Sequence, residues 1–263
     1  ELGLGLGDLS DFVAVRGKGV RGTVDDHSVL VGSRTFLEEQ DVTVAALEQE
    51  MRRLEEEGKT AMLVAVDGDL MGVLAVADTL KEDAVAAVRE LREMGLETVM
   101  ITGDNPRTAQ AIARQVGIDR VLAQVLPDEK LAEIRRLQEE TDGLVAMVGD
   151  GINDAPALTQ ADVGIAIGTG TDIAIEAADI TLVRGDLSGV VSAAKLSRAT
   201  FRKVMQGLFW AFFYNVVMIP LAILGMMHPV LAEIAMATSS VTVVTNANLL
   251  RRVDIRPRYA QEA

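Results

Sequence analysis

The hydrophobic and polar positions of this chain divide it into three regions with different patterns. In the first 76 residues, short apolar runs with the alternation of β-strands are separated by Gly-containing turns, and one amphipathic helix interrupts them. Asp67-Gly68-Asp69 joins the last two runs and predicts a tight hairpin turn. We therefore expect an antiparallel α+β segment. The predicted strands are residues 12–15, 20–24, 29–32, 61–66 and 71–76, and the predicted helix is 42–57.

From residue 77 to residue 190, apolar strands alternate strictly with amphipathic helices. Because strands that are connected through helices run parallel, this pattern predicts an α/β fold with a doubly wound parallel sheet. Ligands of such sheets bind at the carboxyl ends of the strands. The predicted strands are 98–101, 121–123, 144–148, 163–167 and 180–183, and the predicted helices are 81–94, 106–116 and 127–140.

The third region, residues 191–252, contains two long uncharged stretches, and a short tail, 253–263, follows it. No charged residue lies between Lys203 and Glu233, or between Glu233 and Arg251. Each stretch approaches the roughly 20 apolar residues that cross a bilayer as a helix, so we expect a transmembrane helical hairpin. A hairpin buried in a soluble protein is the alternative.

Basic residues gather at both open ends of this hairpin. By the positive-inside rule, these ends and the soluble regions attached to them are predicted to be cytoplasmic. The basic residues are Lys195, Arg198, Arg202, Lys203, Arg251 and Arg252.

Composition narrows the classes of function. A formal net charge of −14 argues against nucleic-acid binding, which needs clustered Lys and Arg. The chain has no Cys, which excludes disulfides, thiolate metal sites and Cys nucleophiles. It starts without Met and without the features of a signal peptide, so we expect a fragment of a longer protein.

The segment Gly149-Asp150-Gly151-Ile152-Asn153-Asp154 follows the predicted strand 144–148. Its two carboxylates stand four residues apart in a Gly-containing turn. Mg²⁺ prefers one or two carboxylates together with water and phosphate oxygens, so the segment suits Mg²⁺ held beside a phosphate. In the alternative interpretation, Asp and Gly only form the turn and cap the next helix.

Two further segments point to phosphate. Thr102-Gly103-Asp104 lies where a strand passes into a helix, where hydroxyl and amide groups favour a phosphoryl group. Ordinary N-capping is the alternative there. Lys130 lies in the first turn of a helix, where the helix dipole does not favour a positive charge. Neutralising a phosphate explains this position, and a chance surface location is the alternative.

Taken in order, Thr-Gly-Asp, Pro127-Asp128-Glu129-Lys130 and Gly-Asp-Gly-Ile-Asn-Asp-Ala-Pro resemble the phosphorylation domain of P-type ATPases. These are cation pumps that form an aspartyl phosphate, and their phosphorylation domain has the haloacid-dehalogenase fold. The resemblance implies ATP and Mg²⁺ as cofactors. It implies a nucleotide-binding segment at 1–76, a phosphorylation domain at 77–190 and a membrane segment at 191–252. It implies catalytic roles for Thr102, Gly103, Asp104, Lys130, Asn153 and Asp154, and Mg²⁺ binding by Asp150 and Asp154.

The nucleophile of that family is not found in this sequence. The family's phosphorylated Asp stands in an Asp-Lys-Thr-Gly-Thr segment, which does not occur here. We therefore expect this chain alone to be inactive and its partner to be the missing N-terminal part of the same pump. Two alternatives stay open. One is a membrane-anchored haloacid-dehalogenase-like phosphatase that uses Asp67-Gly68-Asp69, although a hairpin suits that segment better. The other is a non-catalytic nucleotide-binding regulatory module.

Gly17-Lys18-Gly19 belongs to a nominal Gly-x-Gly-x-x-Gly motif, but a strand follows it where a dinucleotide site requires a helix. It is similar instead to the Gly-x-Gly loop of heavy-metal pumps, which implies that Gly17 and Gly19 contact ATP. Ser33 replaces the Asn of that subfamily's Val-Gly-Asn stretch. The Glu and His-Pro adenine contacts of the subfamily, which are expected upstream of this stretch, are missing.

In the predicted membrane hairpin, Tyr214 and Asn215 interrupt an apolar helix, and Met236 and Ser240 share one face of the second helix. Helix packing is the ordinary explanation of such residues. The combination resembles the last two membrane helices of copper-transporting P-type ATPases. A thioether suits the soft ion Cu⁺, and the resemblance extends to Ag⁺. The zinc and cadmium branch has a Lys in the first helix and an Asp in the second, which are not found here.

Overall fold

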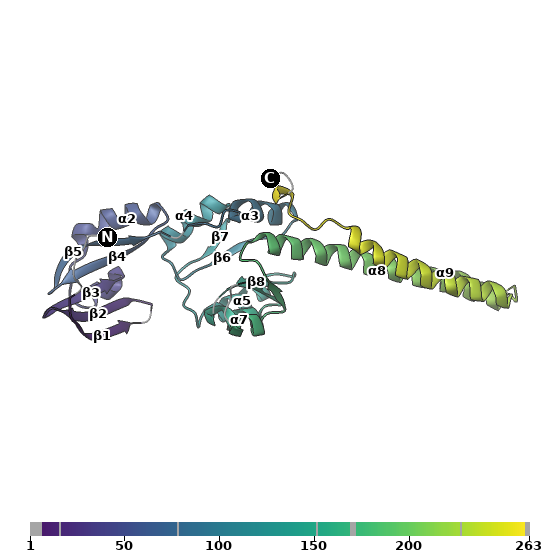
Figure 1. The fold of residues 1–263 in the computed structure, drawn as a ribbon, viewed down its shortest axis with the longest axis horizontal. Helices are drawn as coiled ribbons and strands as arrows, with labels where there is room; N and C mark the ends of the chain where they lie inside the picture. The colour runs from purple at the N-terminus through teal and green to yellow at the C-terminus, as the bar shows by residue number, and fades with distance from the viewer. Residues whose placement is uncertain are drawn as a thin grey trace. The chain divides into compact units, whose positions relative to one another are not determined.

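The chain folds into two compact units, Glu1–Asp186 and Leu187–Ala263, which are described separately (Figure 1). A sheet-and-helix segment and a parallel α/β segment form the first unit, and two long helices form the second. The computed structural model describes residues 7–15, 17–77, 79–150, 152–168, 172–226 and 228–260.

Five antiparallel strands in the order β1-β2-β3-β4-β5 form the sheet at the start of the chain. Alternate side chains of one strand, Ala61, Leu63 and Ala65, are buried against Met51 and Leu54 of a helix. The predicted antiparallel α+β segment is thus confirmed. The elements are β1 (Leu9–Val15), β2 (Gly19–Val24), β3 (His27–Gly32), α1 (Arg34–Glu38), η1 (Ala45–Leu47), α2 (Glu48–Glu56), β4 (Thr60–Val66) and β5 (Asp69–Val76).

The helix predicted at 42–57 begins later than the apolar pattern indicates. Val42 and Val44 are buried in the core from an irregular segment, so their apolar character reflects packing and not helical periodicity. The hairpin predicted at Asp67-Gly68 is confirmed, since both residues have positive φ, 50° and 88°, between the antiparallel β4 and β5. The Asp67 carboxylate accepts a hydrogen bond from the Ser28 amide at 2.8 Å.

The second segment of this unit contains parallel strands, as the alternation predicts. They form two hydrogen-bonded groups, β6-β7 and β10-β9-β8, and no ladder joins β6 to β8 within the described residues. Met147 of β8, Ile134 and Leu158 belong to one core cluster, and Val99 and Ile101 of β6 pack against it. The strands are β6 (Val99–Ile101), β7 (Arg120–Leu122), β8 (Ala146–Gly149), β9 (Val163–Ile167) and β10 (Ile180–Leu182).

Within its described residues, this α/β segment contains five α-helices. The helix predicted at 127–140 begins only at Lys130, because a turn precedes it in which Leu126 donates its amide to the Glu129 carboxylate at 3.0 Å. Two short helices escaped the sequence pattern, since six residues give too little periodicity. The helices are α3 (Ala84–Glu93), α4 (Pro106–Val116), α5 (Lys130–Glu140), α6 (Ala155–Gln160) and α7 (Asp172–Ala177).

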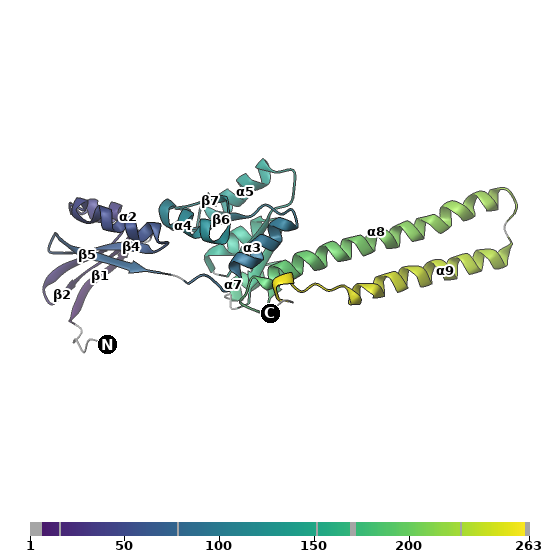
Figure 2. The same cartoon turned by 90° about the horizontal axis from the view of Figure 1, so that it is seen from above.

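The second unit is a helical hairpin of α8 (Ser188–Ile223) and α9 (Pro229–Asn248), which run alongside each other (Figure 2). Lys203 and Asn246 join them, through a Lys203 Nζ to Asn246 Oδ1 hydrogen bond of 3.1 Å and an Asn246 Nδ2 to Lys203 carbonyl bond of 3.1 Å. The short helices η3 (Leu249–Arg252) and η4 (Arg258–Ala260) follow.

In the described part of the chain, one helix, α8, is long and apolar enough to cross a membrane, by length and composition alone. Of the side chains described in α8, only Val190 and Val191 are buried. The predicted helical hairpin is confirmed as a structure, whereas the crossing of a membrane by α8 and α9 stays a prediction.

Candidate functional site

An ion pair between Lys130 and Asp154 joins two of the predicted site residues. Lys130 is the first residue of α5, and Asp154 ends η2 (Ile152–Asp154) beyond the carboxyl end of β8. Lys130 Nζ lies 2.6 Å from Asp154 Oδ1, and the two side chains are only 18% and 12% exposed. Such a half-buried pair is screened less than a surface pair. The Asp154 side chain makes no capping hydrogen bond to α6, so simple helix capping does not explain it.

Gly149 permits the position of Asp154. A Cβ at residue 149 would lie 2.8 Å from the Cβ and 3.0 Å from the Cγ of Asp154, which is too close for any residue but glycine. Asp150 and Asn153 are exposed next to it, and Gly151 lies outside the described residues. The motif therefore presents polar groups at the end of β8, with Asp154 fixed by packing on one side and by Lys130 on the other.

The Thr-Gly-Asp loop, residues 102–104, follows β6. Thr102 Oγ1 donates to Asp104 Oδ2 at 2.8 Å, and the Asp104 amide donates to Thr102 Oγ1 at 3.1 Å. Asn105 caps α4, since its side-chain oxygen accepts from the amides of Arg107 and Thr108 at 3.0 and 3.1 Å. Asn105 is therefore the residue that caps α4, whereas the Asp104 carboxylate accepts its hydrogen bonds from other groups.

Gly103 is exposed, and the fold itself gives no reason for a glycine there. Its φ is not in the left-handed region, and a Cβ would meet only the Val125 carbonyl oxygen, at an ordinary 3.7 Å. The backbone amide of residue 103 is therefore open to close approach by a ligand.

The carboxylates of Asp150 and Asp154 are the described groups that suit a metal ion at this site. No group of three or more His, Asp or Glu side chains arranged for a metal occurs among the described residues. Mg²⁺ does not need such a cage, because it is commonly bound by one or two carboxylates and completed by phosphate oxygens and water. The donor set fits Mg²⁺ bound together with a phosphoryl group.

The structure gives Gly17 and Gly19 local roles. Gly17 has a φ of +72° in the turn before β2. A Cβ at residue 19 would lie 2.3 Å from the Val31 carbonyl oxygen and 2.6 Å from the Gly32 Cα, so these two strands can pair only with glycine there. A Cβ at residue 17 would lie 3.3 Å from Leu126 Cδ2, which puts the Gly-x-Gly turn next to the segment that leads to Lys130.

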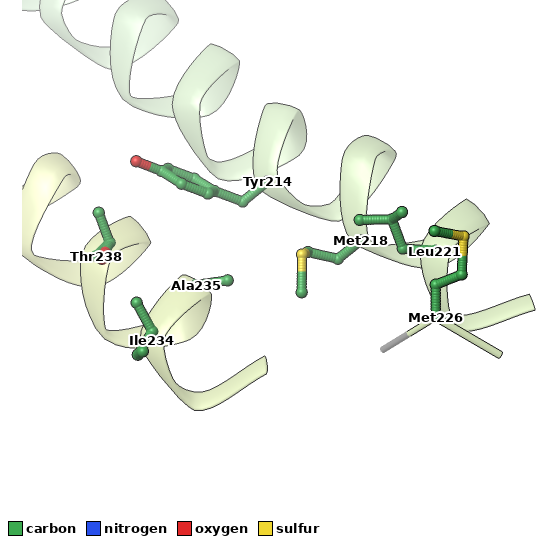
Figure 3. A pocket seen from close by; sticks show the side chains of 7 residues that line it. All are labelled: Tyr214, Met218, Leu221, Met226, Ile234, Ala235 and Thr238. Atoms are coloured by element: carbon green, nitrogen blue, oxygen red, sulfur yellow. The ribbon is translucent and has the colours of Figure 1, made fainter. Parts of the chain in front are cut away.

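The four predicted ion-binding residues are not gathered in the hairpin. Tyr214 lines a cavity of about 290 Å³ between the helices (Figure 3). Asn215 donates its side-chain amide to the Ala211 carbonyl at 2.8 Å. Met236 is 69% exposed and Ser240 is exposed, so both lie on a face of α9 that α8 leaves open. The remaining residues of the cavity are Met218, Leu221, Met226, Ile234, Ala235 and Thr238.

The sequence did not single out Glu55, Arg34 and Arg107, which form a charge cluster around the buried Glu55 carboxylate, beside the Thr-Gly-Asp loop. A signal was present, because Glu55 follows Met51 and Leu54 at helical spacing and so lies on the apolar face of α2. A charged residue in that position needs a buried partner.

A family model described as hydrolase, haloacid dehalogenase-like hydrolase, matches residues 5–162. The chain belongs to the haloacid dehalogenase-like hydrolase family. This match covers the Thr-Gly-Asp loop, Lys130 and Asp154, and it confirms the fold predicted from their order.

Curated relatives narrow the family further. A copper-exporting P-type ATPase of Staphylococcus saprophyticus is 52% identical over 248 residues, 94% of this chain and 31% of the relative. A probable copper-exporting P-type ATPase V of Mycobacterium tuberculosis is 57% identical over 258 residues, 96% of this chain and 33% of the relative. The chain thus spans about a third of the length of the curated relatives it matches.

Among solved structures, a zinc-transporting PIB-type ATPase in its E2.Pi state has a TM-score of 0.69 at 36% identity. The match covers 93% of this chain and 39% of that chain. The predicted resemblance to copper-transporting P-type ATPases is confirmed by these relatives.

Proposed function

We propose that this chain is part of an ATP-driven pump that exports monovalent copper and forms an aspartyl phosphate within a longer protein. Residues 1–76 then belong to its nucleotide-binding domain, 77–190 to its phosphorylation domain, 191–252 to its membrane region and 253–263 to a cytoplasmic tail. The observation that carries the proposal is the Lys130–Asp154 pair of 2.6 Å at the end of β8, beside Asp150.

In this proposal, the residues at the strand ends hold a phosphoryl group. The Thr102 hydroxyl and the Gly103 amide donate hydrogen bonds to its oxygens, and Lys130 neutralises their charge. Asp150 and Asp154 bind Mg²⁺, which when present offsets the negative charge that develops in phosphoryl transfer. Asn153 donates from the same turn. The protein's part in such a reaction is positioning and charge neutralisation, and these residue types are sufficient for both.

The nucleophilic Asp is proposed to come from outside this chain. The proposal is supported by the two groups of parallel strands, β6-β7 and β10-β9-β8, which share one core without a ladder between β6 and β8 in the described residues. A parallel strand that paired with both β6 and β8 would end beside Thr102 and Gly149. An Asp directly after that strand would face Lys130 and Asp154. The chain alone is accordingly proposed to be inactive, and Gly17 and Gly19 to contribute to an ATP site that is completed elsewhere.

The transported ion is proposed to be Cu⁺, with Ag⁺ as a chemical mimic. Met236 offers a thioether, a ligand that favours soft ions, and Tyr214, Asn215 and Ser240 offer neutral oxygen and nitrogen groups. Identity of 51–57% to copper-exporting relatives, against 36% to the zinc-transporting structure, favours the same choice. We propose that α8 and α9 both cross the cell membrane and that the soluble unit is cytoplasmic.

The test is a chimera in which this chain replaces the matching third of the Mycobacterium tuberculosis relative. In lipid vesicles, Cu⁺ and Ag⁺ should each stimulate ATP hydrolysis and yield an acid-stable phosphoenzyme, and Zn²⁺ should not. Stimulation by Zn²⁺ alone would overturn the choice of ion. The absence of any phosphoenzyme would overturn the proposal that this chain is part of a pump.

A phosphatase is the second candidate, because the matching family model describes hydrolases in general. Its nucleophile would be Asp69 in the hairpin between β4 and β5. Hydrolysis of p-nitrophenyl phosphate by this chain alone, abolished by Asp69→Asn, would establish the phosphatase. If this chain binds ATP but neither the chain alone nor the chimera hydrolyses it, the chain is instead a regulatory module.

A further inference from the structure

The end of α2 and the start of β4 contact the Thr-Gly-Asp loop and the helix that follows it. The central residue is Glu55, whose side chain is only 1% exposed. Arg34 binds it in a bidentate manner, with Nη1 to Oε1 at 2.6 Å and Nη2 to Oε2 at 3.0 Å. Arg107, in the first turn of α4, donates from Nη1 to the same Oε2 at 3.2 Å. Glu55 therefore bridges the antiparallel sheet segment and the parallel α/β segment.

Two further hydrogen bonds run beside this bridge. Thr60 Oγ1 donates to Asp104 Oδ1 at 3.0 Å, and Thr108 Oγ1 donates to the Lys59 carbonyl at 2.9 Å. Thr108 is 1% exposed, so its hydroxyl lies inside the contact and not at its rim. The chain between residues 55 and 60 thus touches the chain between residues 104 and 108 at three points.

The two arms of the bridge differ in burial. The Arg34 side chain is 24% exposed, and its Nε also donates to Glu48 at 2.6 Å, which anchors α2 to α1. The hydrogen bond to Glu55 raises the pKa of Arg34 further above its ordinary range, which is consistent with a tight pair. Arg107 is 45% exposed. The Arg34 arm holds the fold of the first segment, whereas the Arg107 arm can be removed without leaving the buried carboxylate unpaired.

We propose that Glu55 is a positioning residue, which acts through Arg107 to set the Thr-Gly-Asp loop at a fixed place relative to the strands that carry Gly17 and Gly19. Thr60 assists by holding Asp104. The inference rests on the proposed function, in which a phosphoryl group must pass from a nucleotide at the first segment to the end of the parallel strands. Transfer from ATP then depends on the bridge. Phosphorylation by inorganic phosphate does not, because it needs only the loop, Lys130 and the carboxylates.

The first test uses this chain in detergent micelles and does not depend on activity. Hydrogen–deuterium exchange is measured for Glu55→Gln, Arg107→Gln and a control on the same helix, Glu56→Gln, whose side chain is exposed. Amides of residues 103–108 should exchange about tenfold faster in the first two variants, since a charge-assisted hydrogen bond is lost, and at the native rate in the control. Amides of β4 should stay protected in Arg107→Gln. If the amides of residues 103–108 exchanged at the native rate in Arg107→Gln, the proposal would be overturned, even if Glu55→Gln failed to fold.

The second test uses the chimera and separates positioning from a general structural role. Arg107→Gln should raise the ATP concentration for half-maximal phosphoenzyme by about tenfold. Arg107→Lys should bring this concentration most of the way back to the native value, because only one guanidinium nitrogen contacts Glu55. Phosphoenzyme formed from inorganic phosphate should remain at the native level. An equal loss with ATP and with phosphate would overturn the positioning role. If the unmodified chimera forms no phosphoenzyme at all, the pump proposal fails, while the exchange experiment still decides whether the bridge positions the loop.

Discussion

The strand-end loops of the first unit and the polar residues of the helical hairpin differ in what holds them. Lys130 and Asp154 are fixed by each other and by close packing against Gly149, all within this chain. In the hairpin, the Asn215 side chain donates to the Ala211 carbonyl of its own helix, and Met236 is 69% exposed. Two residues of the proposed phosphate site are therefore held in place within the chain, whereas residues of the proposed ion site lie on open faces of α8 and α9.

The apolar surface follows the same division. In the first unit, Leu63, Leu37 and Met51 are almost completely buried. Along α8, Phe209 is 61% and Phe212 is 67% exposed. Large exposed apolar surfaces mark a membrane or protein interface, so the hairpin is shaped for contacts with lipid and with other helices.

The largest contrast is expected for stability. Leu63→Ala should destabilise the first unit by about 2–5 kcal/mol, because it removes fully buried methyl groups from the core. Met236→Ala should change stability by less than about 0.5 kcal/mol, because the side chain is exposed on α9. Urea unfolding measures both, followed through the exchange of β4 amides for Leu63→Ala and of α9 amides for Met236→Ala. A comparable loss in the two variants would erase the contrast between the units.

Removal of the Lys130 charge should have the next largest effect. In the chimera, Lys130→Ala is expected to slow phosphoenzyme formation by about 10²–10³-fold, the usual cost of removing one electrostatic contact to a transferred group. Arg135→Ala is the matched control, since it removes a charge from the same helix and its side chain donates only to Gln160 in the described structure. Equal rates in the two variants would remove Lys130 from the site.

Crowding of Gly149 gives a sharper test of how Asp154 is held. Gly149→Ala should destabilise the first unit by about 1–3 kcal/mol, because the added Cβ would lie 2.8 Å from the Asp154 Cβ. Gly103→Ala should cost little stability, because its Cβ meets only one atom at 3.7 Å, and should impair phosphoenzyme formation instead. Thermal unfolding of this chain and phosphorylation of the chimera distinguish the two glycines. A similar loss of stability in both would contradict the distinction.

The smallest effect concerns an exposed pair in the first unit. His27 Nδ1 lies 2.6 Å from Asp67 Oδ2. Its hydrogen bond with Asp67, and then the charge of Asp67, raise the pKa of His27 above 6.5, and the same contact lowers the pKa of Asp67 below 3.8. The pair should contribute its full stabilisation of the folded state at pH values below the ordinary His pKa. This stabilisation is lost as pH rises through the raised pKa of His27. On the acid side, the contribution falls as pH drops through the lowered Asp67 pKa.

An NMR titration of the His27 imidazole checks the sign. Its midpoint should lie above 6.5 and should return toward that value in Asp67→Asn. A midpoint below 6.5 in the unmodified chain would contradict the pair, and the fully exposed setting makes the change in stability small.

The sequence predicted where the strand-end residues lie, because its signals are local. Thr102, Lys130 and Asp154 each stand directly after a strand or at a helix start, and the alternation of strands and helices then places them at one edge of a sheet. The start of α5 was missed by three residues, because the capping turn at Leu126 and Glu129 resembles helix in composition.

What the sequence could not supply was contact between distant segments. Glu55 and Arg107 are 52 residues apart, and only the packing of α2 on α4 joins them. The separation of the parallel strands into two groups was equally invisible, because apolar runs record burial and not the identity of the neighbouring strand. The local reason for Gly19, its close approach to Gly32, also requires the register of β2 on β3.

The separation of β6 from β8 has a consequence for handling the molecule. Within the described residues, β6 pairs with β7 and β8 pairs with β9, so each is a strand with no ladder partner on its other side. Such edges are templates for intermolecular pairing. Concentrated solutions of this chain should therefore associate through backbone pairing, in proportion to concentration and largely independent of salt. A short peptide with a parallel-strand sequence should suppress that aggregation by occupying the edges first.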